Sequence, residues 1–527
     1  MRTRSGHGRS VAMALAMAMA ACSSDSDTMA FDESGAPMAP GGASNGTGPG
    51  TTTPGQEREV ESDYEAPVAT GHYVWVANPK SGRVAYVDAA TLEVHTVEAG
   101  NGPTYVSSVP AQTDDTALVL NVLSQDATLL RATKNGISTK TFDVAARANS
   151  VAYSADGRYA IAWADARKVD QAPRTEGFQD LTILDLVAGT SYVVAVGYRP
   201  VAVGFAAGTT HAYAVTQDGI AILEASGTPA VTSNVAVSDT PNEDPGSRDV
   251  SVTPDGKVAL IRRDGSSSVT VVSLDKGTRA SVALPGEVTD LDLTDLGDKA
   301  IATIRETSQV AILPVPGILT DPATFETVPI TGETVGSVVL PPGGLKALLY
   351  TNAFAAERLT ILDLAQTPPP FRTVRLYSPV LAVFSSPDAN HAVVLHDRTQ
   401  ATADGTPGTP GAFSVVPVGN ALPAKIVATQ APPAAVAVVD DRAIVAERDN
   451  STKVFGAYLV KMPQLMVDRL PLASPPIAVG VVEGAKRAYV SQQHPEGRLT
   501  FVDLDTGAAR TLTGFELSAR VVDGSKP

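Results

Sequence analysis

The clearest pattern of apolar and polar positions in the chain runs from Ser474 to Gly507. The apolar segment IAVGVV ends at Glu483-Gly484, the segment RAYVS alternates until the polar QQHPEG, and RLTFVDL alternates until an Asp-Thr-Gly turn. Apolar runs and period-two alternation, bounded by turn residues, are typical of β-strands. The stretch therefore predicts three strands in succession, separated by turns.

The same order and spacing recur along the chain, which identifies a repeat protein. The units resemble bacterial β-propeller repeats of the Tyr-Val-Thr-Asn type, known from surface-layer-like proteins. The resemblance implies blades in which an innermost strand A precedes a Pro-Asp-Gly-like turn, strand B is the AYV-like run, strand C ends in Val-Asp or Leu-Asp, and strand D is outermost. Ten segments fit strand A: TYVSSV (104–109), ANSVAYS (148–154), PVAVGF (200–205), DVSVT (249–253), VTDLDL (288–293), VGSVVL (335–340), PVLAVFS (379–385), AAVAVV (434–439), IAVGVV (477–482) and SARVV (518–522).

Two unmatched segments predict how the ring closes. YVWVAN (73–78) is a B-like run without an A strand before it, and SARVV (518–522) is an A-like run without a B strand after it. Pairing the two would leave no exposed sheet edge at the junction. The span from His72 to Pro527 divided by ten gives about 46 residues per unit. We therefore predict an all-β fold, a single closed ring of about ten four-stranded blades. Eight or nine blades and two smaller propellers stay open, and the family resemblance alone implies seven.

Composition narrows the classes of partner. Apolar residues make up 43% of the chain and charged residues 18%, with a formal net charge of −16. Nucleic acids and anionic bilayers require a basic face, so the acidic balance disfavours both as electrostatic partners. Cationic ligands, or solubility alone, fit the charge better.

The N-terminus carries an export signal. Arg2, Arg4 and Arg9 precede the apolar run 11–21, which is too short to span a bilayer. Met19-Ala20-Ala21-Cys22 resembles the lipobox of bacterial lipoproteins, although that family usually has Leu at the position of Met19. The resemblance implies lipidation of Cys22, the only cysteine, and Ser23 implies sorting to the outer membrane.

The alternative is an ordinary signal peptide that ends at Ala20-Ala21. The predicted organisation is a lipoprotein signal peptide (1–21), a lipid-anchored tether (22–65) whose few apolar side chains cannot drive folding, and the propeller (66–527). The membrane partner is thus reached through the lipid on Cys22.

Insertions predict where a binding face lies. Long polar segments separate B from C strands at 165–180 and 397–411, with shorter ones at 352–358, 447–453 and 492–498, and an acidic D-A segment spans 238–247. B-C and D-A loops of a propeller emerge on one face, and loops on a rigid scaffold commonly carry binding sites. Tolerated surface variation is the alternative explanation.

Charged residues also gather where A strands begin, at the channel mouth on that face. The candidate binding residues are Arg147, Arg199, Arg248, Asp249, Asp290 and Arg520. Such residues could contact a ligand or peptide, or could pair with one another across blades.

No motif predicts catalysis. His391 and His396 form the only local histidine cluster, but strand positions five apart face opposite sides of a sheet, so a shared metal site is disfavoured. Trp75 and Trp163 fall in B strands and are expected in the core. We predict no cofactor, no metal and no catalytic residue.

Three functional hypotheses remain. The first is a non-enzymatic envelope lipoprotein whose propeller face binds a protein or small ligand. The second is a propeller enzyme, either a metal-dependent lactonase-like hydrolase or a redox protein. The third is a structural scaffold of the envelope.

Overall fold

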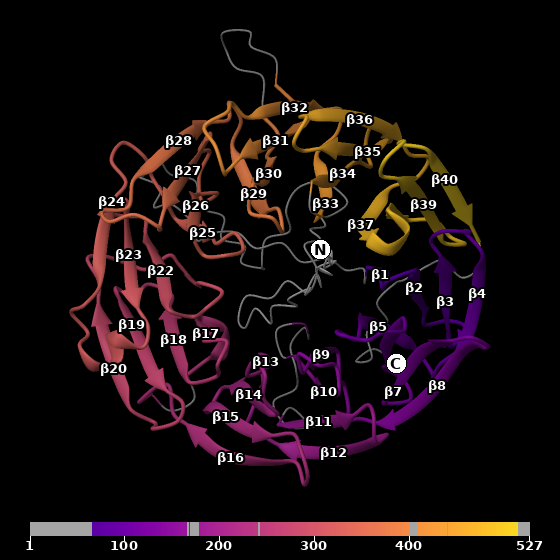
Figure 1. The fold of residues 1–527 in the computed structure, drawn as a ribbon, viewed down its shortest axis with the longest axis horizontal. Coiled ribbons are helices and arrows are strands. Elements are labelled where there is room, and N and C mark those ends of the chain that lie inside the picture. The colour runs from indigo at the N-terminus through magenta and orange to yellow at the C-terminus, as the bar shows by residue number, and fades with distance from the viewer. Residues whose placement is uncertain are drawn as a thin grey trace, which may run out of the picture.

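The computed structural model describes residues 66–165, 168, 179–240, 243–399, 408–439 and 441–514. These residues form ten four-stranded antiparallel sheets, arranged as the blades of a single ring (Figure 1). The predicted ten-bladed β-propeller is confirmed. The predicted signal peptide (1–21) and tether (22–65), with Cys22, lie outside the described residues.

Within every blade the strands follow one another in chain order from the innermost to the outermost. Blade 1 comprises β1 (Val68–Ala69), β2 (Tyr73–Asn78), β3 (Arg83–Asp88) and β4 (Val94–Glu98); blade 2, β5 (Pro103–Ser108), β6 (Thr116–Asn121), β7 (Asp126–Thr133) and β8 (Gly136–Asp143); blade 3, β9 (Ser150–Tyr153), β10 (Tyr159–Trp163), β11 (Asp180–Asp185) and β12 (Thr190–Ala195). Blade 4 comprises β13 (Ala202–Phe205), β14 (His211–Thr216), β15 (Gly219–Glu224) and β16 (Ala230–Val235); blade 5, β17 (Arg248–Val252), β18 (Val258–Arg263), β19 (Ser268–Ser273) and β20 (Arg279–Ala283).

The second half of the ring repeats this arrangement. Blade 6 comprises β21 (Asp290–Leu293), β22 (Lys299–Ile304), β23 (Gln309–Pro314) and β24 (Glu326–Pro329); blade 7, β25 (Ser337–Val339), β26 (Lys346–Tyr350), β27 (Arg358–Asp363) and β28 (Phe371–Arg375). Blade 8 comprises β29 (Val380–Ser385), β30 (His391–His396), β31 (Gly411–Pro417) and β32 (Lys425–Thr429); blade 9, β33 (Pro433–Val439), β34 (Arg442–Asp449), β35 (Val454–Lys461) and β36 (Met466–Pro471); blade 10, β37 (Pro476–Val482), β38 (Arg487–Gln492), β39 (Arg498–Asp503) and β40 (Ala509–Thr513). Short helical turns are η2 (Pro245–Ser247), α1 (Gly317–Thr320) and η3 (Glu483–Ala485).

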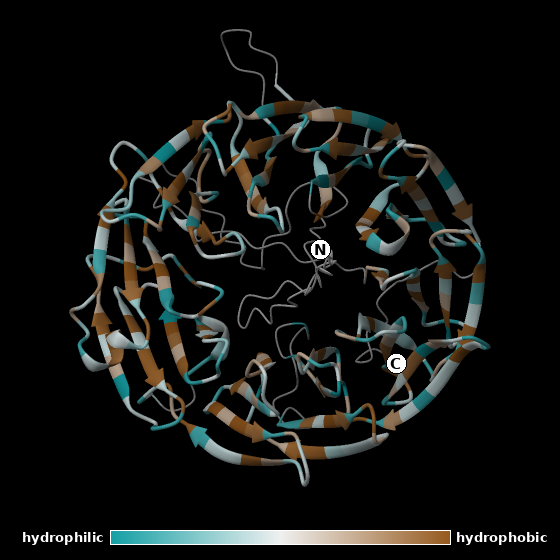
Figure 2. Cartoon of the chain, viewed as in Figure 1, coloured by the Kyte–Doolittle hydropathy of each residue, from teal (hydrophilic) through white to brown (hydrophobic). Residues whose placement is uncertain are grey.

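The apolar pattern explains the place of each strand. The second strand of a blade is packed on both faces, so β6 (TALVLN) is buried at every position. The fourth strand meets solvent, and β8 (GISTKTFD) is exposed at most positions. Figure 2 shows hydrophobic colours along the strands and hydrophilic colours at many turns.

The core lies between neighbouring blades. One apolar cluster joins Val258 and Leu260 of blade 5 to Leu291 and Ala300 of blade 6. Trp75 is fully buried, and Trp163 is 7% exposed. The prediction that both tryptophans belong to the core is confirmed.

The ends of the ring meet through side chains of blades 1 and 10. Val74 and Val87 pack against Val482 and Phe501 in one apolar cluster. Tyr489 Oη donates a 2.5 Å hydrogen bond to the Pro67 carbonyl.

The innermost strand of blade 1 comes from the residues directly before β2, which the sequence analysis left without an A strand. Val68 pairs with Trp75, and Ala69 pairs with Val74. Within the described part of the chain, the inner edge of β2 is therefore occupied by β1. The expected closing strand, 518–522, lies outside the described residues.

Candidate functional site

Adjacent strands are antiparallel, so the B-C and D-A loops of all blades emerge on one side of the ring, here called the loop-rich face. The predicted charged residues occur at or just before innermost strands on this face. Arg147 precedes β9, Arg199 precedes β13, Arg248 and Asp249 begin β17, and Asp290 begins β21. Arg520 lies outside the described residues.

Two arginines hold the acidic D-A segment between blades 4 and 5. Arg248 Nη1 donates a 2.5 Å hydrogen bond to Glu243 Oε2, and Arg263 Nε donates a 2.5 Å hydrogen bond to Glu243 Oε1. Burial disfavours the charged form of Glu243, but these two guanidinium groups hold its pKa below the ordinary value. Arg248 is itself 5% exposed and also donates a 2.7 Å bond to the Thr216 carbonyl.

Further ion pairs fix the rest of this segment. Arg199 Nη1 lies 3.2 Å from Asp244 Oδ1, and Arg279 Nη2 lies 2.5 Å from Asp239 Oδ1. The carboxylates that the sequence analysis placed in a polar, acidic loop are therefore matched by arginines of the surrounding blades.

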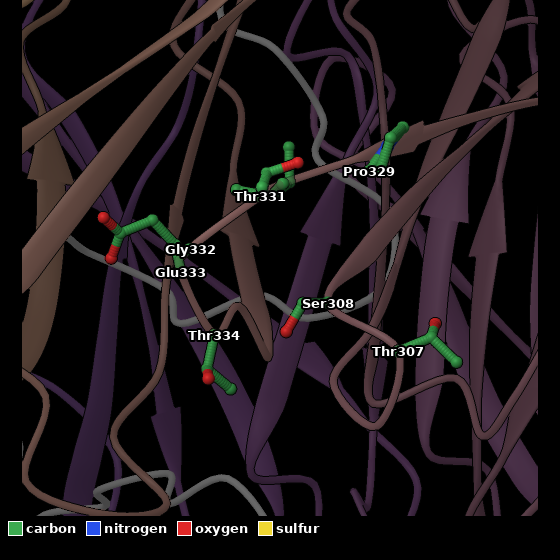
Figure 3. A pocket seen from close by; sticks show the side chains of 8 residues that line it. Thr307, Ser308, Pro329, Thr331, Gly332, Glu333 and Thr334 are labelled. Atoms are coloured by element: carbon green, nitrogen blue, oxygen red, sulfur yellow. The ribbon is translucent and has the colours of Figure 1, made fainter.

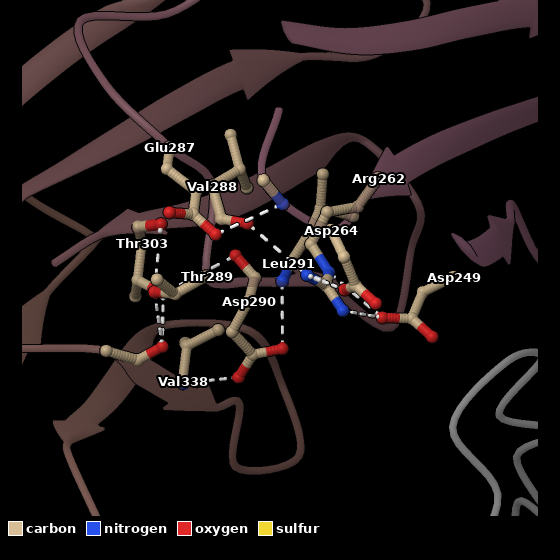
Figure 4. Close-up of polar contacts among 12 residues, drawn as sticks. Asp249, Arg262, Asp264, Glu287, Val288, Thr289, Asp290, Leu291, Thr303 and Val338 are labelled. Atoms are coloured by element: carbon tan, nitrogen blue, oxygen red, sulfur yellow. Dashed lines mark hydrogen bonds and ion pairs between the residues drawn. The ribbon is translucent and has the colours of Figure 1, made fainter. Parts of the chain in front are cut away.

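A second polar cluster lies where blades 5, 6 and 7 meet (Figure 4). Arg262 donates hydrogen bonds to Asp249 Oδ2, and its Nη1 lies 3.1 Å from Asp264 Oδ1. Burial opposes the charge of Arg262, but Asp249 and Asp264 raise its pKa. The guanidinium group of Arg262 thus connects two carboxylates on the loop-rich side of blade 5.

Asp290 joins blade 6 to blade 7. Its Oδ1 accepts a 2.9 Å hydrogen bond from the Leu291 amide, and its Oδ2 accepts a 2.8 Å bond from the Val338 amide of β25 (Figure 4). Burial raises the pKa of Asp290 to about 7, although these amide bonds and Arg262 favour the charged form. The side chain therefore has a structural contact across the blades and titrates near neutral pH.

Two more carboxylates continue this contact along the channel side of the blades. Burial raises the pKa of Asp292 to about 6, while the amides of Leu293 and Leu340 hydrogen-bond to it. Asp295 Oδ2 accepts a 2.5 Å bond from the Gly343 amide. Asp290, Asp292 and Asp295 thus bind three backbone amides of the next blade.

A shallow hollow of about 400 Å³ opens beside this cluster on the loop-rich face. A B-C turn (307–308) and a D-A segment (329–334) line it, with hydroxyl groups from Thr307, Ser308, Thr331 and Thr334 (Figure 3). Its wall is braced by a 2.7 Å ion pair between Glu333 Oε1 and Arg358 Nη1.

Two exposed aromatic residues occur on loops next to this wall. Phe354 is 41% exposed in the B-C loop of blade 7, and Tyr377 is 63% exposed in the following D-A loop. The loops are joined by hydrogen bonds from the Leu376 amide to the Glu357 carbonyl and from the Val380 amide to the Ala356 carbonyl. Arg375 lies over the Tyr377 ring, 4.7 Å from its centroid.

The two predicted histidines, His391 and His396, lie at opposite ends of β30. His396 is fully buried and its ring nitrogens contact the Pro379 carbonyl at 3.2 Å and Ser414 Oγ at 2.7 Å. Burial lowers the pKa of His396 to about 4, so the ring is neutral at physiological pH. Among the described residues, no group of three or more His, Cys, Asp or Glu side chains is placed to hold a metal ion.

Sequence reasoning places Glu243 in the acidic D-A segment, but it misses four other residues of these clusters: Arg262, Arg263, Asp292 and Arg358. Asp292 could have been found, because it lies two residues after Asp290 and strand alternation places both side chains on one face. The arginines carried no such signal, since their roles depend on which loop of the neighbouring blade approaches them.

No protein-family model matches the chain, and no curated protein matches it. Among solved structures, the chain is similar to hydrazine synthase of Kuenenia stuttgartiensis, with 18% identity over 61% of this chain and 99% of that chain and a TM-score of 0.33. It is also similar to the dihydro-heme d1 dehydrogenase NirN (13% identity, 89% and 77% coverage, TM-score 0.41) and to apo AztD of Citrobacter koseri (12% identity, 77% and 96% coverage, TM-score 0.41).

NirN and AztD are β-propeller proteins. At this level of identity the similarity concerns the fold alone. The assignments to the lipoproteins and to the Tyr-Val-Thr-Asn repeat family stay predictions.

Proposed function

We propose that the protein is a non-enzymatic binding module of the bacterial cell envelope. It is anchored in the outer membrane through lipid on Cys22, and the loop-rich face of its propeller binds a protein or a small ligand. Within the described residues, no helix is long and apolar enough to cross a membrane. The lipid is the proposed membrane attachment.

The observation that carries the proposal is a set of loops across blades 6, 7 and 8 that an ion pair and hydrogen bonds link to one another. It comprises the hydroxyl-lined hollow, the Glu333–Arg358 ion pair, and the loops that expose Phe354 and Tyr377. Aromatic side chains supply large contact areas, and neighbouring hydroxyl groups and ions supply orientation. Rigid blades beneath these loops keep the surface in place.

The experiment that tests binding compares two faces of the same molecule. The full chain is expressed in its bacterial envelope, cross-linked and purified. Phe354→Ser with Tyr377→Ser should remove a cross-linked partner or ligand. Leu296→Ser with Leu345→Ser is the matched control, because these leucines are 84% and 61% exposed in A-B turns on the opposite face. Equal capture by both double variants would contradict the proposed surface.

Membrane attachment is tested in the same cells. Cys22→Ser should move the protein from the outer-membrane fraction to the soluble fraction, because the thiol is the nucleophile to which lipid is attached. A Cys22→Ser variant that still sediments with membranes would contradict the anchor.

A further inference from the structure

The outermost strands differ in how they protect their free edges. Such a strand pairs with strand C on one side and leaves backbone amides and carbonyls open on the other. Proteins commonly place charged residues there, which discourages pairing with another chain. In eight of the ten blades the outermost strand contains at least one Asp, Glu, Lys or Arg: β4, β8, β20, β24, β28, β32, β36 and β40.

The two uncharged outer strands are neighbours on the rim. They are β12 (TSYVVA) and β16 (AVTSNV), of blades 3 and 4 (Figure 1). The sequence contains no charged residue from Leu186 to Tyr198 or from Ala225 to Ser238. Lys140 of β8 reaches Gly189, so this cation flanks the beginning of β12.

Strand β12 also exposes apolar side chains. Val193 is 63% exposed, Tyr192 is 41% exposed, and Val187, in the turn before the strand, is 72% exposed. β12 pairs with β11 from Thr190 to Ala195, and among the described strands no other pairs with its outer edge. An uncharged, apolar and open edge of this kind is a template for another β-strand.

We propose that β12 is a self-association site, where the outer edges of two copies of this chain pair antiparallel about a two-fold axis. The two blades then form one continuous sheet. The strand can complement itself. A two-fold axis at Val193 sets Val193 opposite Val193 of the second copy and sets each Tyr192 opposite Val194, so that facing side chains lie on the same side of the joined sheet. Aromatic and β-branched residues are favourable cross-strand partners.

Charge determines where two copies can meet. Each chain has a formal net charge of −16, so two copies repel one another over most approaches. At the rim of blades 3 and 4 no charged side chain of the outer strands faces the other copy. One strand pair buries less area than a standard stable interface, so the dimer should form in the micromolar range.

Sedimentation velocity of the full chain in mild detergent, at about 1 to 100 µM, tests the proposal. The native chain should shift from monomer to dimer over this range. Val193→Lys should keep it monomeric, because two lysines would meet across the two-fold axis; Tyr192→Lys is the second variant. Thr96→Lys, an exposed position on outer strand β4, is the matched control and should dimerise like the native chain.

Circular dichroism melting of each variant separates loss of the dimer from loss of the fold. The proposal is overturned by a native chain that stays monomeric, which would leave β12 to a strand of a different protein. A dimer that persists in the folded Val193→Lys and Tyr192→Lys variants would also overturn the proposal. Open-ended oligomers larger than a dimer would overturn it as well.

Discussion

Two seams between neighbouring blades differ at their innermost strands, although each seam contains an apolar cluster. In the seam of blades 9 and 10, Ala435 and Ala437 of innermost strand β33 pack against Val479 of β37 in an apolar cluster. In the seam of blades 6 and 7, Asp290 and Asp292 occupy the same positions of innermost strand β21. The hairpin registers establish the equivalence. Ala435 and Ala437 pair with Ala446 and Ile444 of β34, and Asp290 and Asp292 pair with Thr303 and Ile301 of β22, so each pair of residues spans the same two rungs of its hairpin.

The polar seam holds its partner strand through directed bonds. The amides of Val338, Leu340 and Gly343 donate to three carboxylates of blade 6. The innermost strands of the apolar seam depend on close contact between small side chains, which does not require donors and acceptors to be aligned. The innermost strands can therefore add amide-to-carboxylate bonds to the apolar packing between blades, and these bonds respond to pH.

The largest expected effect comes from placing a carboxylate in the apolar seam. Ala435 is fully buried, so Ala435→Asp would bury a charge without the amides that serve Asp290. The variant should lose at least about 3 kcal/mol of unfolding free energy. Urea unfolding followed by circular dichroism measures the loss.

Ala509→Asp is the matched control for this substitution, because Ala509 is exposed on outer strand β40. It should change the unfolding free energy little. Similar urea midpoints for the native protein and Ala435→Asp would show that the apolar seam accepts a carboxylate. The proposed difference between the two seams would then be contradicted.

The second prediction concerns the pH dependence of the polar seam. An aspartate of the unfolded chain releases its proton near pH 4, whereas burial raises the pKa of Asp292 to about 6 and that of Asp290 to about 7. Between these values the folded protein binds more protons than the unfolded chain, so its stability falls as the pH rises. Asp290→Asn with Asp292→Asn should flatten the decline in urea midpoint between about pH 5 and about pH 8.

Asp503→Asn is the control for this slope. Hydrogen bonds from the Thr506 amide and hydroxyl hold the pKa of Asp503 below its ordinary value, so it stays ionised throughout this range. Its replacement should leave the slope unchanged. An equal slope in the native protein and in the Asp290→Asn/Asp292→Asn variant would show that other groups govern the pH dependence.

The two seams also show what sequence could and could not predict. Period-two alternation and recurring turns predict the ten blades, because the apolar pattern of each strand follows the burial of its own side chains. The strand VTDLDL (288–293) is predicted, and Asp290 is interpreted as a channel-mouth charge that could bind a ligand or pair across blades, whereas Asp292 is missed. Their bonds to Val338 and Leu340 depend on how blade 7 approaches blade 6. β1 was missed because a strand of two residues has no periodicity to detect.

The smallest expected effect comes from the hydroxyl groups that extend the polar seam. The Gly336 carbonyl of blade 7 accepts a 2.7 Å bond from Thr289 Oγ1 and a 2.9 Å bond from Thr303 Oγ1. Thr289→Val or Thr303→Val alone leaves the carbonyl one donor, so each should cost about 0.5 to 1 kcal/mol. The double variant removes both donors and should cost more than the sum of the two, which urea unfolding of all four proteins measures. Strict additivity would instead mean that the two hydroxyl groups act independently and that the seam does not depend on satisfying this carbonyl.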